Sequence, residues 1–143
     1  MKRLVCAGNW KMHKTAREAV DFFARFAPHV ANIPKDVAIV LCPPFTAIPA
    51  LSRTLTGETR VFLGAQDVHW DRSGAFTGAI AAPMLREFGV RYVIVGHSER
   101  RRYFADTDET VRMKTAAALE EGLTPIVAVG ETLAIREAEQ TEQ

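Results

Sequence analysis

Three residues that can move protons or hold charge stand together at the end of an apolar run. In "YVIVGHSERRR", the apolar segment and a glycine are followed by His97, Ser98 and Glu99. A neutral imidazole at such a point can donate a hydrogen bond to a carbonyl oxygen and stabilise an enolate as it forms. Backbone N–H groups at the start of a helix disfavour a cation, so a helix that begins here would keep His97 neutral. A lone histidine is more often structural, but these neighbours favour a chemical role for His97.

A second polar pair, Asn9 and Lys11, follows the first apolar run of the chain. A lysine beside the end of a buried strand needs an anion to face, so Lys11 predicts an anionic substrate. Asn9 could hold the lysine or a substrate oxygen by hydrogen bonding. Glu99 could be a general base or only the counter-ion of Lys11. These residues alone predict proton-transfer or aldol-type chemistry on an anionic carbonyl compound.

Short apolar runs and helical patterns alternate along the chain and must position these residues. The runs are rich in Val, Ile and Leu without polar alternation, which is typical of parallel strands covered on both faces; they are Leu4–Ala7, Val37–Cys42, Val61–Ala65, Tyr92–Val95 and Pro125–Val129. Helical patterns lie between them, at about 16–30, 47–55, 83–89 and 108–121, and a further one opens in "ETLAIREAEQTEQ". Thr15 with Glu18 predicts a capping box for the first helix, and Asp106 with Glu109 predicts the cap of the fourth.

The β/α alternation fits either an open doubly wound sheet or a closed (β/α) barrel. A dinucleotide-binding sheet carries a G-x-G-x-x-G turn after its first strand, whereas this chain has "AGNWKMHK" there. Polar residues follow several strands instead, among them Gln66 and Asp67 after the third and Glu131 after the fifth, which favours a barrel active site. We therefore predict a TIM (β/α)8 barrel fold. Such barrels have eight strands and about 250 residues, so we expect residues 1–143 to be the N-terminal part of one barrel domain, with the C-terminal units absent.

Composition narrows the class of protein further. The chain is 48% hydrophobic and 24% charged with a formal net charge of +1, which argues against disorder and against a nucleic-acid or anionic-membrane partner. Cys6 and Cys42 lie in apolar runs and are predicted to be buried free thiols, so neither a metal site nor a disulfide is expected. No apolar run approaches the length of a membrane span, and we predict a soluble cytoplasmic protein.

Five motifs, in order along the chain, resemble the triosephosphate isomerase family: "AGNWKM" at 7–12, "GAQD" at 64–67, "GAFTG" at 74–78, "VIVGHSERR" at 93–101 and "VGETL" at 129–133. The resemblance implies interconversion of dihydroxyacetone phosphate and glyceraldehyde 3-phosphate through an enediolate, in glycolysis and gluconeogenesis, without a cofactor.

The family's site residues match positions of this chain one by one. Asn9 and Lys11 match the pair that contacts the substrate, and His97 matches the neutral electrophile. Glu99 matches a supporting carboxylate rather than the base, and Ser98 matches a neighbour that holds the base when the site is open. The family's base is a glutamate after the sixth strand, and its phosphate site follows strands seven and eight. Because these units are absent, we expect residues 1–143 alone to be inactive.

The segment from Gln66 to Gly78 could by composition be a loose surface loop. In the family it projects into a partner subunit, with the threonine that matches Thr77 at its tip, so the resemblance implies a homodimer. The chain departs from the family at Ala79 and Ala81, where a glutamate and a serine are usual and where we expect weaker capping or subunit contacts. It also has Ala105 in place of a glycine and Ala128 in place of a cysteine. Trp10 and Trp70 are interpreted as packing groups.

Two other functions remain open from the residues. A stand-alone half-barrel could serve as a binding or assembly module, because its first and fifth strands would leave open edges that need self-association or a partner chain. Another phosphosugar enzyme of similar fold is disfavoured by the linked motifs.

Overall fold

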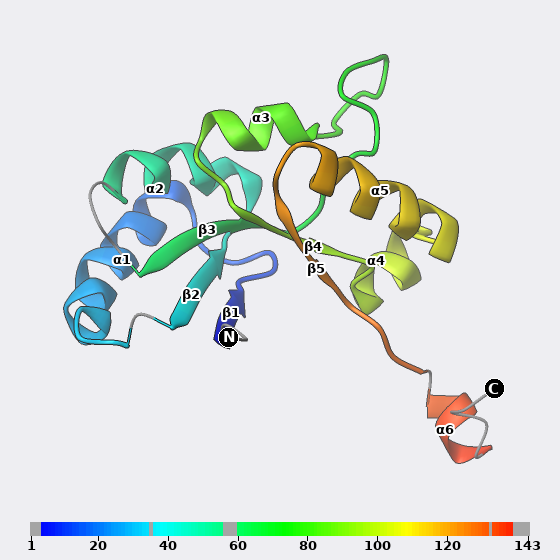
Figure 1. Ribbon diagram of the computed structural model, residues 1–143, viewed down its shortest axis with the longest axis horizontal. Coiled ribbons are helices and arrows are strands. Elements are labelled where there is room, and N and C mark those ends of the chain that lie inside the picture. The colour runs from blue at the N-terminus through cyan, green and yellow to red at the C-terminus, as the bar shows by residue number, and fades with distance from the viewer. Residues whose placement is uncertain (1–3, 35, 56–59, 132, 139–143) are drawn as a thin grey trace.

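Five parallel strands form one curved sheet in the order β1-β2-β3-β4-β5 (Figure 1). The computed structural model describes residues 4–34, 36–55, 60–131 and 133–138. The strands are β1 (Leu4–Asn9), β2 (Val37–Cys42), β3 (Val61–Ala65), β4 (Tyr92–Val95) and β5 (Thr124–Val127). Every neighbouring pair is parallel. The predicted partial barrel is therefore confirmed. The strand β1 ends two residues later than predicted, and β5 ends two residues earlier than predicted.

Helices connect the strands and cover the outer side of the sheet, except for the last helix, which follows β5 and lies away from the sheet (Figure 1). Their bounds are α1 (Ala16–Val30), a short 3₁₀ turn at Phe45–Ala47, α2 (Ile48–Thr54), α3 (Ala82–Glu87), α4 (Ser98–Tyr103), α5 (Asp108–Glu120) and α6 (Leu133–Glu137). The helix α4 was not predicted as an element of its own. It buries none of its residues, so its sequence carries no apolar periodicity that could have announced it.

The predicted cap of α1 is confirmed and that of α5 is wrong. Thr15 and Glu18 form the expected reciprocal capping box. In α5 the box is formed by Thr107 and Thr110 instead. Asp106 cannot act as a cap, because its carboxylate is buried and accepts a hydrogen bond from Lys114 Nζ at 2.8 Å.

Burial follows the position of each strand in the sheet. The strands β2, β3 and β4 are buried along nearly their whole length, as predicted. The prediction is wrong for β1 and β5, which are edge strands: Leu4 is 63% exposed and Val127 is 42% exposed. Cys6 on β1 is accordingly exposed, contrary to expectation, whereas Cys42 on β2 is buried as expected, and this burial raises the pKa of the Cys42 thiol to about 12.

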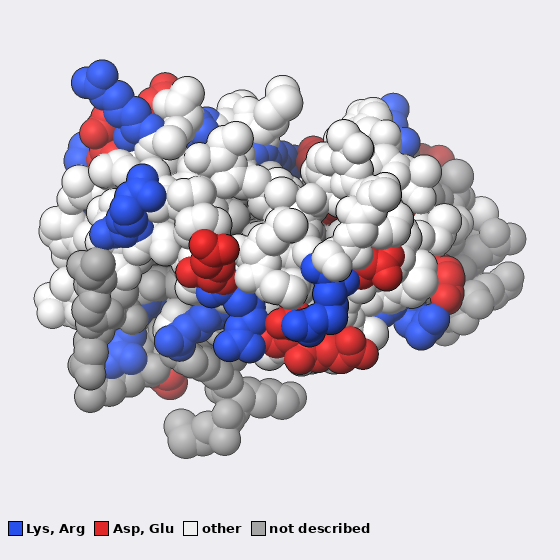
Figure 2. All heavy atoms as spheres, turned by 90° about the horizontal axis from the view of Figure 1, so that it is seen from above, with Lys and Arg blue, Asp and Glu red and all other residues white. Residues whose placement is uncertain are grey.

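Two apolar clusters fill the two sides of the sheet. The larger one packs the helices against the outer side and includes Phe23, Ile48 and Leu51. The smaller one lies on the other side and includes Val40, Cys42 and Tyr92. Figure 2 shows basic and acidic side chains lying close to one another on the visible face. Among the described helices, none is both long and apolar enough to span a bilayer.

Candidate active site

The residues that follow the carboxyl ends of the strands form what we call the carboxyl rim, comprising residues 9–11, 66–67 and 97–99. Lys11 is fixed there in an unusual backbone conformation, with a φ of 52° in the left-handed region. The Asn9 side chain accepts a hydrogen bond from the Lys11 N–H at 3.0 Å. The Gln66 amide donates to the Lys11 carbonyl at 2.9 Å. Two neighbouring amide side chains thus hold the backbone that aims this lysine.

Gln66 connects two strand ends of its own chain. Its amide nitrogen donates to the Cys42 carbonyl at 2.8 Å as well as to Lys11. Sequence reasoning placed Gln66 in a subunit-contact loop and did not foresee this internal role. No sequence signal identifies it, because its two acceptors are backbone carbonyls remote along the chain.

Lys11 and Glu99 form an ion pair across the carboxyl rim, with 2.7 Å between Lys11 Nζ and Glu99 Oε1. The hydrogen bond from Lys11 lowers the pKa of the Glu99 carboxyl. The pair is half-exposed, so it stabilises the fold only weakly. Its geometry favours the interpretation of Glu99 as the counter-ion of Lys11 over that of a general base, because a base needs a raised pKa.

His97 caps α4 and has a defined tautomer. Its Nδ1 accepts a hydrogen bond from the Glu99 N–H at 3.2 Å, which leaves the ring proton on Nε2. The helix start that would disfavour a cation at His97 is present, since α4 begins at Ser98. Gly96 turns the chain out of β4 with a φ of 72°. The side chain of His97 is a quarter exposed and can therefore offer its Nε2–H to a ligand.

These groups line one pocket of about 410 Å³ at the carboxyl rim. Asn9, Lys11, Gln66, His97 and Glu99 all contribute to it, so the structure brings together most residues predicted from separate strand ends. The pocket is further lined by Met12, His13, Arg100, Tyr103 and Phe104. Ser98 is exposed at the first position of α4 and is not among the lining residues. Trp10 packs edge-on against Phe22 at 5.1 Å, in agreement with a packing role.

A ring of four charged side chains, which sequence reasoning missed, lies beside this pocket. Lys114 Nζ is 2.8 Å from both Asp67 Oδ1 and Asp106 Oδ1. Arg100 contacts the same two carboxylates, at 2.9 Å from Asp67 and 3.3 Å from Asp106. The Arg100 side chain is three-quarters buried in this ring. Lys114 could have been noticed, because it stands in the stripe of α5 that also carries Val111 and Ala118.

The segment from 66 to 78 is held by its own contacts rather than lying loose. His69 stacks on Trp70 and lies tilted against Phe76, with ring centroids 4.2 Å apart in both pairs. Arg72 forms an ion pair with Glu121 at the end of α5. Thr77 is exposed. The loop projects from the body of the molecule beyond α3 (Figure 1).

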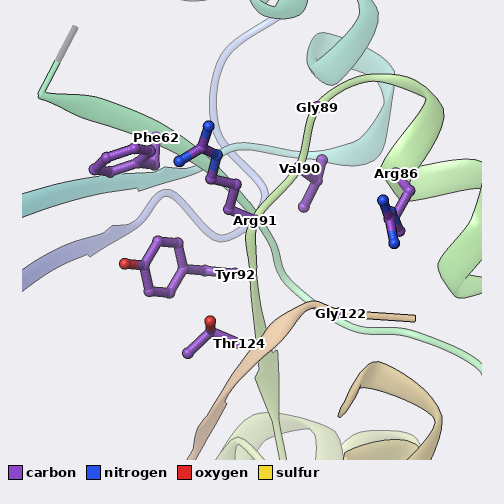
Figure 3. A pocket seen from close by; sticks show the side chains of 8 residues that line it. All are labelled: Phe62, Arg86, Gly89, Val90, Arg91, Tyr92, Gly122 and Thr124. Atoms are coloured by element: carbon purple, nitrogen blue, oxygen red, sulfur yellow. The ribbon is translucent and has the colours of Figure 1, made fainter. Parts of the chain in front are cut away.

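A second cavity opens at the opposite ends of the strands, where residues 89–91 and 122–124 form what we call the amino rim (Figure 3). Its volume is about 440 Å³, and Arg86 and Arg91 line it. Arg86 donates a hydrogen bond of 2.6 Å to the Glu121 carbonyl, and the Arg91 guanidinium lies 5.0 Å from the centre of the Phe62 ring. Both cations are thus used by the fold itself. Across the described part of the chain, no group of three or more His, Cys, Asp or Glu side chains could hold a metal ion.

The family model of triosephosphate isomerase matches residues 4–143, which is nearly the whole chain. The chain belongs to the triosephosphate isomerase family. It is 53% identical over 142 residues to the triosephosphate isomerase of Acaryochloris marina and 54% identical over 142 residues to that of Picosynechococcus sp.. Each alignment covers 99% of this chain and 58% of the relative, so the chain spans somewhat more than half the length of these relatives.

The likeness extends to the three-dimensional structure. A crystal structure of triosephosphate isomerase from Bartonella henselae superposes with a TM-score of 0.89 at 37% sequence identity. The superposition covers 97% of this chain and 56% of that one. The half-barrel therefore has the arrangement of a known family member over its described length.

Two departures from the triosephosphate isomerase pattern have visible local consequences. Ala81 is the N-cap of α3 and makes no side-chain cap hydrogen bond, as expected for an alanine in place of a serine. Ala105 has a φ of 58°, so a residue with a Cβ occupies a left-handed position that a glycine would adopt without strain. Ala128 lies just after β5, where its N–H donates to the Val95 carbonyl at 2.9 Å.

Proposed function

We propose that this chain is the substrate-polarising half of a triosephosphate isomerase, which interconverts dihydroxyacetone phosphate and glyceraldehyde 3-phosphate in glycolysis and gluconeogenesis. The observation that carries the proposal is the hydrogen bond from the Glu99 N–H to His97 Nδ1. It leaves a neutral imidazole with its proton on Nε2, in the same pocket as Lys11 and Asn9. Residues 1–143 are proposed to be the N-terminal part of one barrel domain.

Each residue of the carboxyl rim has a proposed task in this reaction. His97 donates its Nε2 proton to the substrate carbonyl as negative charge develops on that oxygen, which stabilises the enediolate. It then moves the proton between the two substrate oxygens. Lys11 offsets the charge of the substrate, and Asn9 fixes a substrate oxygen. A short charge-assisted bond from Lys11 keeps Glu99 ionised, so Glu99 supports the lysine and leaves proton abstraction to another group.

The proton-abstracting base of the family follows the sixth strand, and the phosphate-binding N–H groups follow strands seven and eight. The described residues provide five strands. Ser98, which in the family holds the base in the open site, is exposed at the start of α4 and faces no such group within the described residues. We call the assembly of residues 1–143 with the three further β/α units of the family the complete barrel, and we assign the activity to it.

Activity of the chain with and without those units tests the proposal. We expect a 143-residue protein of verified mass to show no meaningful turnover, because the base alone contributes about 10²- to 10⁴-fold. Joining residues 1–143 to the C-terminal segment of the Acaryochloris marina relative is expected to restore turnover. Robust isomerase activity of the mass-verified 143-residue protein would contradict the assignment of the base, and an inactive, folded complete barrel would contradict the function.

The remaining expectations concern the working enzyme. It needs no cofactor, acts in the cytoplasm and forms a homodimer. In this dimer the projecting loop, with Gln66 at its base and Thr77 near its tip, reaches the partner's carboxyl rim. The ordered aromatic stack of His69, Trp70 and Phe76 supports this role, because a preformed loop loses little entropy on docking.

A half-barrel that acts as a binding or assembly module is the second candidate, and the exposed sheet edges favour it. Leu4 and Val5 on β1 are 63% and 46% exposed, and Val129 beyond β5 is 88% exposed. Such apolar strand edges invite pairing with another chain. Intact mass measured together with oligomeric state separates the two candidates: a 143-residue native protein in a stable inactive assembly supports the module, and a longer active protein rejects it.

A further inference from the structure

The four-membered charged ring joins two segments of the chain that carry opposite sides of the candidate active site. Lys114 on α5 bonds Asp67 and Asp106, and Arg100 on α4 bonds the same two carboxylates. Each cation thus contacts both anions, which closes the ring. The side chains of Lys114 and Asp106 are only 4% and 6% exposed, so the centre of the ring is screened from water.

On one side the ring leads to Lys11. Asp67 directly follows Gln66, whose amide holds the Lys11 carbonyl at 2.9 Å. The left-handed backbone of Lys11 depends on such bonds, because that conformation is unfavourable for a lysine. Any shift of Asp67 therefore passes through one peptide unit to the group that orients Lys11.

On the other side the ring leads to His97. Arg100 lies on α4 three residues after His97, and the Arg100 N–H donates to the His97 carbonyl at 2.9 Å. The helix α4 buries none of its residues, so no apolar face fixes its position. Its side-chain attachments are polar: Arg100 in the ring, Arg101 to the Gly96 carbonyl and Asp108, and Glu99 to Lys11.

We propose that Lys114 is a positioning residue, which through Asp67 and Asp106 sets the placement of Lys11 relative to His97. The expected change in kcat rests on the proposed function. The expected change in the placement of Lys11 and His97 rests on the ring geometry alone. Lys114 bonds Asp67 and Asp106, and neither of these carboxylates lines the pocket, so its effect reaches the site through the ring. Burial raises the pKa of Asp67, which indicates that its charge is held there at a cost and needs both cations.

The test compares three variants of the complete barrel with the parent protein. Lys114→Met removes both bonds to the carboxylates, Asp106→Asn keeps the size of the side chain but removes its charge, and Lys114→Arg keeps a cation able to bond both carboxylates. Arg112→Met is the matched control, because Arg112 lies on the same helix in an exposed pair with Glu109. The measurements are kcat and KM, together with the ¹⁵N NMR signals of the His97 ring and of Lys11 Nζ.

We expect Lys114→Met to lower kcat about tenfold or more with little change in KM, since misplacing catalytic groups by an ångström costs up to roughly 10²-fold. The His97 and Lys11 signals should shift, Asp106→Asn should show the same pattern more weakly, Lys114→Arg should recover most of kcat, and Arg112→Met should leave all readouts unchanged. If Lys114→Met does not fold, Asp106→Asn alone decides.

Loss of stability with unchanged kcat and unchanged His97 and Lys11 signals overturns the proposal, because the ring would then only hold the fold together. If the parent complete barrel proves inactive, the proposed function has failed. The two NMR signals still report whether Lys114 positions His97 and Lys11, so the failure of one proposal is distinguishable from that of the other.

Discussion

The two rims of the sheet carry cavities of similar volume and similar cationic lining, yet their cations are used differently. The pocket at the carboxyl rim measures about 410 Å³ and the cavity at the amino rim about 440 Å³. At the amino rim, Arg86 donates a hydrogen bond to a backbone carbonyl, and Arg91 lies over an aromatic ring. At the carboxyl rim, Lys11 is held by a half-exposed carboxylate in an open pocket, from which an anionic ligand can draw it away.

The direction of the helices explains this difference. In a β/α unit the helix runs back against its strand, so helix N-termini gather at the carboxyl rim and helix C-termini at the amino rim. At its N-terminus, α5 is capped by the Thr107 side chain. At its C-terminus the Glu121 carbonyl accepts a bond from Arg86. Orphan carbonyls at the amino rim attract cations for structural reasons, whereas N–H groups at the carboxyl rim favour bound anions.

The comparison teaches that a cavity with arginines is not by itself an anion site. The backbone N–H groups of Gly89, Val90, Arg91 and Thr124 at the amino rim all donate to backbone carbonyls of the described chain. A ligand there would meet carbonyl oxygens first. Substitutions at equivalent places of the two rims should therefore have unequal effects, and the following predictions start from the largest expected difference.

Of the substitutions at the carboxyl rim, His97→Gln is expected to lower catalytic activity most. Glutamine cannot take up and return a proton as imidazole does, so kcat of the complete barrel should fall about 10²- to 10⁴-fold with a smaller change in KM. Steady-state kinetics in both reaction directions measure this. Arg91→Gln at the amino rim is the control and should leave kcat within about twofold. An unchanged kcat in His97→Gln would remove His97 from its proposed role.

Lys11→Met is expected to weaken anion binding at the carboxyl rim alone. Losing a hydrogen bond to a charged group costs about 1.5–3 kcal/mol, so Kd for glycerol 3-phosphate should rise about 10- to 150-fold in calorimetric titrations of the complete barrel. Arg86→Met should leave that Kd unchanged and lower the stability of the fold by about 1 kcal/mol through the lost bond to the Glu121 carbonyl. Equal effects of the two variants on Kd would mean that the amino-rim cavity also binds the anion.

A feature of the fold or the site could be predicted from the sequence where it depends on residues that are close together along the chain. The five strands follow from continuous Val, Ile and Leu runs, and the α1 cap from two residues three positions apart. The exposure of Cys6 could not be predicted, because it depends on what lies beside β1 rather than on the run itself. Asp106 was wrongly predicted to cap α5, because its partner, the buried Lys114, lies further along that helix. The site residues could be predicted because they follow strand ends. The charged ring beside them could not be predicted, because the bond from Lys114 to Asp67 joins residues that are 47 positions apart.

Gly96→Ala is expected to destabilise the carboxyl rim more than Gly89→Ala destabilises the amino rim. The two glycines have nearly the same φ, 72° and 71°, so an alanine pays the same left-handed penalty of about 1–2 kcal/mol at either place. A Cβ at Gly96 would also lie 3.0 and 3.1 Å from the Val111 methyl groups and 3.2 Å from the Ala128 carbonyl oxygen, whereas a Cβ at Gly89 meets nothing within 4 Å.

Urea unfolding of the two variants measures the extra cost of crowding at Gly96, which we expect to be about 1 kcal/mol. Equal losses of stability would show that Val111 and the Ala128 carbonyl both move aside without cost. Gly96 would then be required only for its backbone conformation, and the packing of α5 against the carboxyl rim would be looser than the contact distances indicate.

Ala81→Ser is expected to produce the smallest change and the only gain. At the C-terminal end of α3, at the amino rim, the Leu85 carbonyl accepts a hydrogen bond from the Phe88 N–H. At the N-terminal end, the N-cap residue Ala81 makes no side-chain hydrogen bond. Ala81 already has the extended backbone of a cap residue, with φ −84° and ψ 154°, so a serine hydroxyl can accept from the Met84 N–H without rearrangement. Pro83 has no N–H to donate. The expected gain is about 1 kcal/mol in the free energy of unfolding. Ala79→Ser, two residues earlier, is the control and should change nothing. A neutral Ala81→Ser would mean that the bond of the Met84 N–H to the Ala81 carbonyl already satisfies the first turn of α3, and that the difference between the two ends of this helix is only apparent.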